Sequence, residues 1–463
     1  MPLPTPSVRV LLILAALSLL PMLNLHYIGE EAIFPISSME MAQHGVWLKQ
    51  YLYGGDVQHN PLFNWLIIPL SNLAGWTHVL QVARSLAIMA TLGTAAVLAW
   101  LTWRLFGQKQ FAAFSALVYL TFVDVMMYHG WLAYVDPLFG FFIFSSIALL
   151  WVACTDNRPR LLWLVVATLT CALLSKAFTA YVFYGAAVFV MLLNTRGRRL
   201  LFSLQSLAAH TAMLAAPILW FAMIPSGHGQ SGRMFDEILA KLTFPEATEY
   251  LTRLALYPLE LLTGLLPASA LAIYFLIRRR VTFATNQPNH FRTALLIAGL
   301  NLLPYWLSPH GGMRYLIPIY PLFALSCAWI IWQAGEAAQG TTRRWLTAAI
   351  LFCFALGLVI FPYYQQKFRG ENYALAANEI VAITHGQPIY TADPSSAGLN
   401  VTAYINQLRY PQQALQYPPA QWENGFVLAR TANPELGAIH SKFQLLGDEL
   451  YLLCRGTACQ RQP

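Results

Sequence analysis

Residues 137–153 read PLFGFFIFSSIALLWVA, a run without a charged side chain. Other predominantly apolar runs lie on both sides of it, at residues 111–127, 161–174 and 178–193, and further out at 8–25, 79–103, 201–223, 254–277, 294–307, 315–332 and 345–361. A helix that crosses a membrane needs about 20 apolar residues. The chain is therefore predicted to be an all-α polytopic membrane bundle with about eleven spans.

The composition agrees with a membrane protein. Of the 463 residues, 57% are hydrophobic and 10% are charged, whereas soluble domains carry about 25% charged residues. The net charge of +8 comes from basic residues in alternate loops, which places those loops in the cytoplasm. We therefore expect no nucleic-acid partner. The basic loop residues are Arg104, Lys109, Arg158, Arg160, Arg196, Arg198, Arg199, Arg278, Arg279, Arg280, Arg292, Arg343 and Arg344.

The opposite loops are acidic and are expected to face the periplasm or exterior. The N-terminus is then cytoplasmic, and its run after Arg9 is read as an uncleaved first span, since no clear signal-peptide cleavage site precedes His26. Residues 1–362 are expected to form the transmembrane region, including a long first exterior loop at 27–75. Residues 363–463 alternate helix-like and strand-like segments and are expected to form a small periplasmic α/β domain. The helix-like segments are 373–384 and 396–407, and the strand-like segments are 388–392, 426–429 and 449–453.

The first exterior loop has helix signals of its own. Glu30 and Glu31 open the segment, Pro35 falls in the first turn, where proline is tolerated, and Gly45 is a typical helix end. Trp47 and other aromatic residues of this loop are of the kind found at membrane interfaces. An amphipathic helix lying along the exterior surface is therefore expected here.

The six cysteines predict no metal site. Four fall in apolar runs as packing residues. Cys454 and Cys459 lie in the exterior tail, where a disulfide is permitted but not required. No cofactor is predicted. The acidic pair Glu30-Glu31 leaves a divalent ion open without specifying one.

Three carboxylates at the exterior ends of apolar runs are candidate catalytic groups: Glu30, Glu31 and Asp136. Ionisable groups at membrane depth are costly and mark functional cavities, although acids at a span end can also simply be solvated. Cations and polar groups on the same side could bind a phosphate. The candidates are His59, Asn60, Lys176, His310, Arg314 and Tyr315, with Arg233, Lys241 and Arg253 in the preceding loop.

Taken in order, these residues resemble the polyprenyl-phosphate-sugar-dependent glycosyltransferases of the GT-C fold, particularly the lipid A aminoarabinose transferases and the protein O-mannosyltransferases. That family opens its first exterior loop with an Asp-Glu pair and closes it with a Lys-Pro-Pro-Leu-like motif. This chain runs Glu30-Glu31-Ala32-Ile33-Phe34, Met39-Glu40-Met41, Gly45-Val46-Trp47 and His59-Asn60-Pro61-Leu62. Further segments similar to the family are Val135-Asp136-Pro137, Leu174-Ser175-Lys176-Ala177 and Arg314-Tyr315-Leu316.

The resemblance implies an enzyme of the bacterial inner membrane. It would move one sugar from undecaprenyl phosphate or a similar carrier to lipid A, another glycolipid or a protein on the periplasmic side. Glu30 or Glu31, with Asp136, would orient or deprotonate the acceptor, and the cations would stabilise the leaving lipid phosphate. This chain departs from the family at three positions. Glu30 replaces the leading Asp, Ile33 replaces a frequent Arg, and Asn60 replaces the Lys before the proline at Pro61. These departures leave the identity of the sugar and of the acceptor open.

Two other functions fit the same pattern. A transporter or flippase for lipid-linked sugars would need the same cavity without a catalytic base, and a non-catalytic envelope assembly factor would need neither. The long acidic first loop and the large tail favour the enzyme.

Overall fold

The computed structural model describes residues 6–56, 60–176, 178–224, 247–279, 290–367, 373–445 and 448–460. The chain divides into two compact units. The first unit comprises Met1–Leu20, Ala87–Trp131 and Val135–Phe354, and the second comprises Pro21–Leu86, Leu132–Tyr134 and Ala355–Pro463. The predicted first exterior loop therefore belongs to the same unit as the C-terminal domain.

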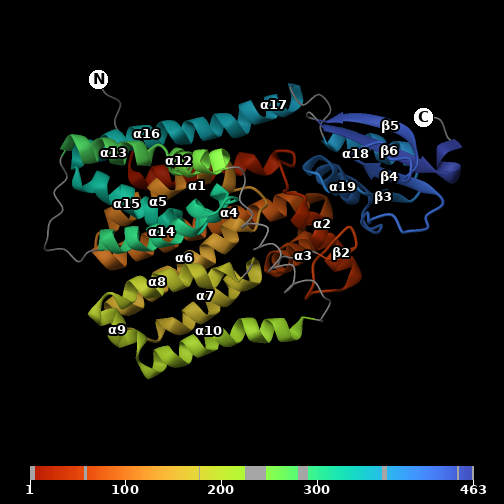
Figure 1. The fold of residues 1–463 in the computed structure, drawn as a ribbon. Coiled ribbons are helices and arrows are strands. Elements are labelled where there is room, and N and C mark those ends of the chain that lie inside the picture. Colours follow the sequence, from red (N-terminus) through yellow and green to blue (C-terminus); the bar gives the residue numbers. More distant parts are fainter. Residues whose placement is uncertain are drawn as a thin grey trace, which may run out of the picture. The chain divides into compact units, whose positions relative to one another are not determined.

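The first unit is a bundle of helices (Figure 1). Its α-helices are α1 (Val8–Leu17), most of α4 (Val79–Phe106), α5 (Lys109–Leu120), α6 (Asp136–Asp156), α7 (Leu161–Ser175), α8 (Thr179–Leu192), α9 (Thr195–Leu201), α10 (Leu204–Met223), α12 (Ala247–Gly264), α13 (Ala268–Arg279), α14 (His290–Leu307), α15 (Tyr320–Gln333) and α16 (Glu336–Ala355). A π-helix at Val125–His129 and a 3-10 helix at Met313–Ile319 complete it.

Helix α6 is the most enclosed of the apolar helices in this unit. It begins at Asp136-Pro137, where proline pre-sets the first turn, and ends at Asn157, whose φ of 55° is left-handed. Of its most apolar window, 78% is buried. It packs along α7, α8 and the 3-10 helix at Met313–Ile319. Gly140 allows the last of these contacts, because a Cβ there would lie 2.8 Å from Ile317 Cγ2.

Within the described residues, five helices are long and apolar enough to cross a membrane, or six if α12 and α13 form one bent span. Each of the apolar runs predicted from the sequence contains a helix, but several of these helices are shorter than a full crossing. The run at 254–277 is not one helix, since α12 and α13 meet at an angle of 99°. Pro267 lies in the break, where proline removes a donor and restricts the residue before it.

The second unit begins with the first exterior loop. A 3-10 helix at Leu20–Asn24 leads to α2 (Ile33–His44), the short β1 (Tyr51–Leu52) and β2 (Gly55–Asp56), α3 (Leu62–Ala74) and a 3-10 turn at Trp76–His78. Gly45 ends α2 with a φ of 64°, as predicted. Helix α2 is not the surface-lying amphipathic helix expected for this segment, because eight of its residues, Phe34 to Met41, are buried.

The C-terminal part of this unit is the predicted small α/β fold. A π-helix at Leu356–Ile360 and α17 (Phe361–Lys367) precede α18 (Tyr373–Thr384), β3 (Ile389–Thr391), α19 (Ser396–Arg409), β4 (Gly425–Ala429), β5 (Ala438–Leu445), β6 (Asp448–Arg455) and a 3-10 helix at Gly456–Gln460. The strand order is β3-β4-β6-β5, with β3 parallel to β4 and the other pairs antiparallel.

The core of this α/β fold follows from its sequence periods. Helix α18 buries Tyr373, Ala376, Ala377, Ile380 and Thr384, the spacing of one helix face. Strand β6 sends alternate residues, from Leu450 to Cys454, into the same core. Cys454 also forms a disulfide with Cys459, which the sequence had left open.

Candidate functional site

The two glutamates that open the first loop have different environments. Glu31 is fully buried beside Arg84, which is also fully buried. Arg84 Nε and Nη2 donate to the two oxygens of Glu31 at 2.8 and 2.6 Å. The backbone N–H groups of Ile28 and Ala133 donate to the same carboxylate at 2.8 and 2.7 Å. Four donors therefore occupy the acceptor positions that a carboxylate offers.

The guanidinium of Arg84 is equally well satisfied. Besides the two bonds to Glu31, it donates to the carbonyl oxygens of Met22, Leu25 and His26 at 2.6–2.9 Å. Glu31 and Arg84 thus tie the end of the N-terminal segment to the start of α4. The sequence signal for Arg84 was an ionisable residue inside an apolar run, which is a pointer to a functional or structural centre.

Glu30, by contrast, is exposed at its side chain while its backbone is fixed. Its N–H donates to Tyr134 Oη at 3.2 Å. The preceding Gly29 has a φ of 60°, and a Cβ there would lie 2.7 Å from the same hydroxyl. Glycine is needed here for both reasons. Of the acidic pair, Glu30 is the member whose carboxylate can meet a substrate.

In the first unit, Asp136 and Lys176 form an ion pair. The sequence had placed both at exterior ends of apolar runs but had not predicted that they pair. Asp136 begins α6, and Lys176 ends α7 at the turn before α8. Lys176 Nζ contacts Asp136 Oδ1, and the side chains are 16% and 8% exposed. Two apolar helices present these groups at their ends, so the pair is shielded on most sides.

Aromatic rings continue from this ion pair. Lys176 Nζ lies 4.6 Å from the centroid of the Tyr315 ring, and the Arg314 guanidinium lies 5.3 Å from that ring. Tyr315 stacks on Tyr305 at 6.0 Å, and Tyr305 stacks on Phe183 at 5.7 Å. Three of the predicted residues, Lys176, Arg314 and Tyr315, are thereby brought together with Asp136.

Arg253 extends the same set of contacts. Its Nη2 donates to the carbonyl oxygen of Gly311, and a Cβ on Gly311 would lie 2.4 Å from the carbonyl oxygen of Tyr305. Arg253 lies over the Tyr257 ring at 5.6 Å. Within the described part of the chain, Arg253 Nε and Tyr257 Oη are buried without a hydrogen-bond partner. Both line a cavity of about 550 Å³ along α12, with Thr248, Glu249, Thr252, Leu256 and Glu260.

A second titratable cluster was not foreseen. His129 Nδ1 and Tyr320 Oη each lie 2.7 Å from an oxygen of Asp124. The π-helix at Val125–His129 puts Asp124 and His129 five residues apart, and π turns of this kind are frequent at functional sites. Asp124 interrupts the apolar run 111–127, which was the available signal.

Comparison with known proteins gives two findings. Residues 254–415 match the model of the Alg9-like mannosyltransferase family. ArnT from Cupriavidus metallidurans, in a crystal structure bound to undecaprenyl phosphate, is similar with a TM-score of 0.67 at 14% identity over 96% of this chain and 97% of that one. Its apo structure gives 0.64 at 14% identity over 98% and 97%. The chain therefore has the fold of ArnT, which is the GT-C fold.

The predicted fold is thereby confirmed, and five or six of the described helices are long and apolar enough to cross a membrane. The match to the mannosyltransferase family covers about a third of the chain and supports the predicted enzyme class. The number of membrane spans stays a prediction. So do the roles of the individual residues, because a structural likeness at this identity concerns the fold.

The remaining predicted site residues are dispersed. Asn60 is 7% exposed in the second unit, and its carbonyl oxygen accepts from Gln50. His310 is exposed in the first unit, where its N–H donates to Ser308 Oγ at 3.4 Å. His59, Arg233 and Lys241 lie outside the described residues. Among the residues that are described, no three His, Cys, Asp or Glu side chains are grouped to hold a metal ion.

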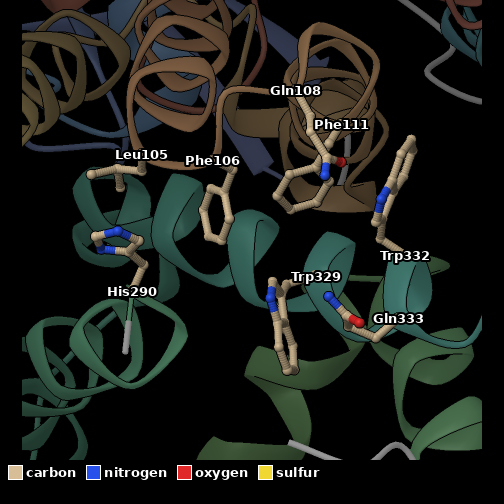
Figure 2. A pocket seen from close by; sticks show the side chains of 8 residues that line it. All are labelled: Leu105, Phe106, Gln108, Phe111, His290, Trp329, Trp332 and Gln333. Carbon is tan, nitrogen blue, oxygen red and sulfur yellow. The ribbon is translucent and has the colours of Figure 1, made fainter. Parts of the chain in front are cut away.

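A further cavity of the first unit lies at the other end of α6. His290 contacts Trp151 at 6.0 Å, about 22 Å along α6 from Asp136 at 1.5 Å per residue. Figure 2 shows the cavity, of about 440 Å³, and its lining of Leu105, Phe106, Gln108, Phe111, His290, Trp329, Trp332 and Gln333. No lysine or arginine lines this cavity. The cavity along α12 is lined by Arg253 and therefore suits a phosphate better.

Proposed function

We propose that the protein transfers a single sugar from a polyprenyl phosphate, such as undecaprenyl phosphate, to an acceptor on the periplasmic side of the bacterial inner membrane. The observation that carries this proposal is the shielded Asp136–Lys176 ion pair, whose lysine lies over the Tyr315 ring together with Arg314. Arg253 of the same unit is bonded to the carbonyl oxygen of Gly311. Fixed cations among apolar helices suit one ligand class in particular, a phosphate attached to a long hydrocarbon chain.

The phosphate would be the leaving group. When the bond between sugar C1 and the phosphate oxygen breaks, negative charge develops on that oxygen, and preorganised cations stabilise it. Lys176 offers a compact ammonium, whereas Arg253 offers a planar donor set with one buried N–H still unpaired. Asp136 would hold Lys176 charged and in place. Tyr257 Oη, also buried and unpaired, could donate to the same phosphate.

Glu30 would orient the acceptor, whose oxygen forms the new bond to C1. A hydroxyl acceptor on a protein or glycolipid would give its proton to the carboxylate. A phosphate acceptor such as that of lipid A is already ionised, so Glu30 would then only orient it. Glu31 would act indirectly, because its oxygens are already occupied by Arg84 and two backbone donors. His59, Asn60 and His310 remain proposed contacts for the substrates.

The test uses purified protein in nanodiscs with extracted envelope lipids and a panel of polyprenyl-phosphate sugars, read by mass spectrometry for an acceptor that gains one sugar. Lys176→Met and Arg253→Met should each lower turnover by about 10²–10³-fold, the usual cost of losing one transition-state donor. Lys109→Met, an exposed lysine of the same unit, is the matched control. Donor movement between leaflets without any product would instead establish the flippase.

A further inference from the structure

Helix α19 of the C-terminal domain contacts the segment that leads into Glu30. Gln407 Nε2 donates to Tyr27 Oη at 2.6 Å, and Asn400 Nδ2 donates to the carbonyl oxygen of Gly29 at 3.1 Å. All four residues belong to the second unit. The contacts therefore join the last quarter of the chain to the backbone one residue before the exposed acid.

Tyr404 adds a third contact from the same helix face. Asn400, Tyr404 and Gln407 are spaced by four and three residues, which aligns their side chains along one side of α19. Tyr404 Oη lies 3.0 Å from His26 Nδ1, and its ring packs edge-on against Tyr27 at 5.0 Å. One face of α19 thus contacts His26, Tyr27 and Gly29.

Glu30 is consequently fixed from both sides. Before it, α19 holds the side chain of Tyr27 and the carbonyl of Gly29. After it, Glu31 is held by Arg84. The N–H of Glu30 itself donates to Tyr134 Oη. An exposed carboxylate on a backbone held at each neighbouring residue has the preorganisation that orientation of a reacting group requires.

Stability alone does not explain why an asparagine occupies position 400. The side chain is fully buried, yet within the described residues its Oδ1 has no hydrogen-bond partner. An apolar residue of similar size would avoid that desolvation cost. What the amide provides, and an apolar residue could not, is a donor directed at the carbonyl of Gly29.

We propose that Asn400 and Gln407 are positioning residues for Glu30, so that the C-terminal domain is part of the catalytic machinery. This inference rests on the proposed function for one point only, the role of Glu30 in orienting the acceptor. The contacts use amide and hydroxyl groups without formal charge, so the arrangement should persist at high salt, unlike one held by surface ion pairs.

The first arm of the test is hydrogen–deuterium exchange on the full-length protein in nanodiscs. Asn400→Ala and Gln407→Met should each raise exchange in residues 26–31 at least tenfold, with the first unit unchanged. Asn378→Ala is the matched control, since Asn378 is an exposed asparagine of the neighbouring α18 whose side chain bonds only within its own helix. Tyr27→Phe, which removes one hydroxyl, covers the event that the larger changes unfold the domain.

The second arm is kinetic. Each positioning variant should lower kcat by about 10–100-fold, because a shift of about 1 Å can cost that much, while the KM for the lipid donor changes less than twofold. Gln407→Met combined with Tyr27→Phe should be no worse than either alone. If the native protein is active, either of two results would overturn the inference. One is unchanged hydrogen exchange in residues 26–31 of the variants, and the other is faster exchange there with a native kcat. A native protein that transfers no sugar from any donor would overturn the proposed function. The exchange measurement would then decide by itself whether α19 holds the loop.

Discussion

The buried pair of Glu31 and Arg84 should govern the stability of the second unit more than the chemistry. Both side chains are fully buried and share two hydrogen bonds of 2.6 and 2.8 Å. Glu31→Gln leaves the guanidinium charge without its counter-charge, and breaking a buried pair in this way costs about 3–5 kcal/mol. At about 2–4 °C per kcal/mol for a unit of this size, the melting temperature should fall by about 10 °C.

A double-mutant cycle separates the pair from its surroundings. Arg84→Met should cost as much as Glu31→Gln, because it strands a buried carboxylate. The double variant should fall short of the sum of the two by about 2–3 kcal/mol, since neither charge is then left alone. It will not recover fully, because three carbonyl groups have also lost the donor that Arg84 gave them.

The assay is thermal unfolding in detergent by tryptophan fluorescence, with sugar transfer measured on the same samples. Glu30→Gln should melt within about 2 °C of the native protein yet lose activity, and Glu379→Gln, an exposed acid of α18, should change neither. Additive costs within about 0.5 kcal/mol, or a Glu31→Gln variant as stable as the native protein, would refute this division of labour between the two glutamates.

Three further outcomes are expected. Burial raises the pKa of Glu40 from 4.5 to about 7 despite two backbone donors. The stabilising contribution of the neutral Glu40 is therefore full below pH 4.5, and the free energy of unfolding falls by about 3 kcal/mol as pH rises through 7. Glu40→Gln should flatten this dependence in melts from pH 4 to 9. Gly29→Ala should cost about 1–2 kcal/mol of stability for its left-handed φ and should lower the rate of sugar transfer. Adding Tyr134→Phe should relieve the clash between the new Cβ and the Tyr134 hydroxyl. Equal activity in the native, single-variant and double-variant proteins would contradict this expectation. Replacing Cys454 and Cys459 with alanine should cost about 2 kcal/mol for so short a loop, and dithiothreitol should lower the native melting temperature equally while leaving the variant unchanged.

Much of the fold could be predicted because its signals are local. Apolar run length located the bundle helices, and a residue of left-handed φ ended α2 at Gly45 as expected. Helix α18 has the predicted bounds, because its apolar spacing is regular. Strand β5 was missed for an equally physical reason: it is an edge strand, with mostly exposed side chains and no apolar alternation.

The candidate site was less accessible from sequence. Topology placed Asp136 and Lys176 at span ends on one side, but it did not indicate that they pair with each other. Glu31 and Arg84 are 53 residues apart, and no spacing rule indicates that one closes on the other. The exposure of Glu30 and the burial of Glu31 also have no sequence signal, since the two are adjacent and nearly identical in chemistry.

The bond between Gln407 and Tyr27 spans 380 residues, which has a consequence for synthesis. At about 5–20 residues per second, the ribosome needs roughly 20–80 s after Tyr27 to make its partner. In the proposed topology the first loop is outside the membrane during that interval, before the helix that contacts it has been made. The loop would then be open to the proteases and chaperones of that compartment until α19 is synthesised.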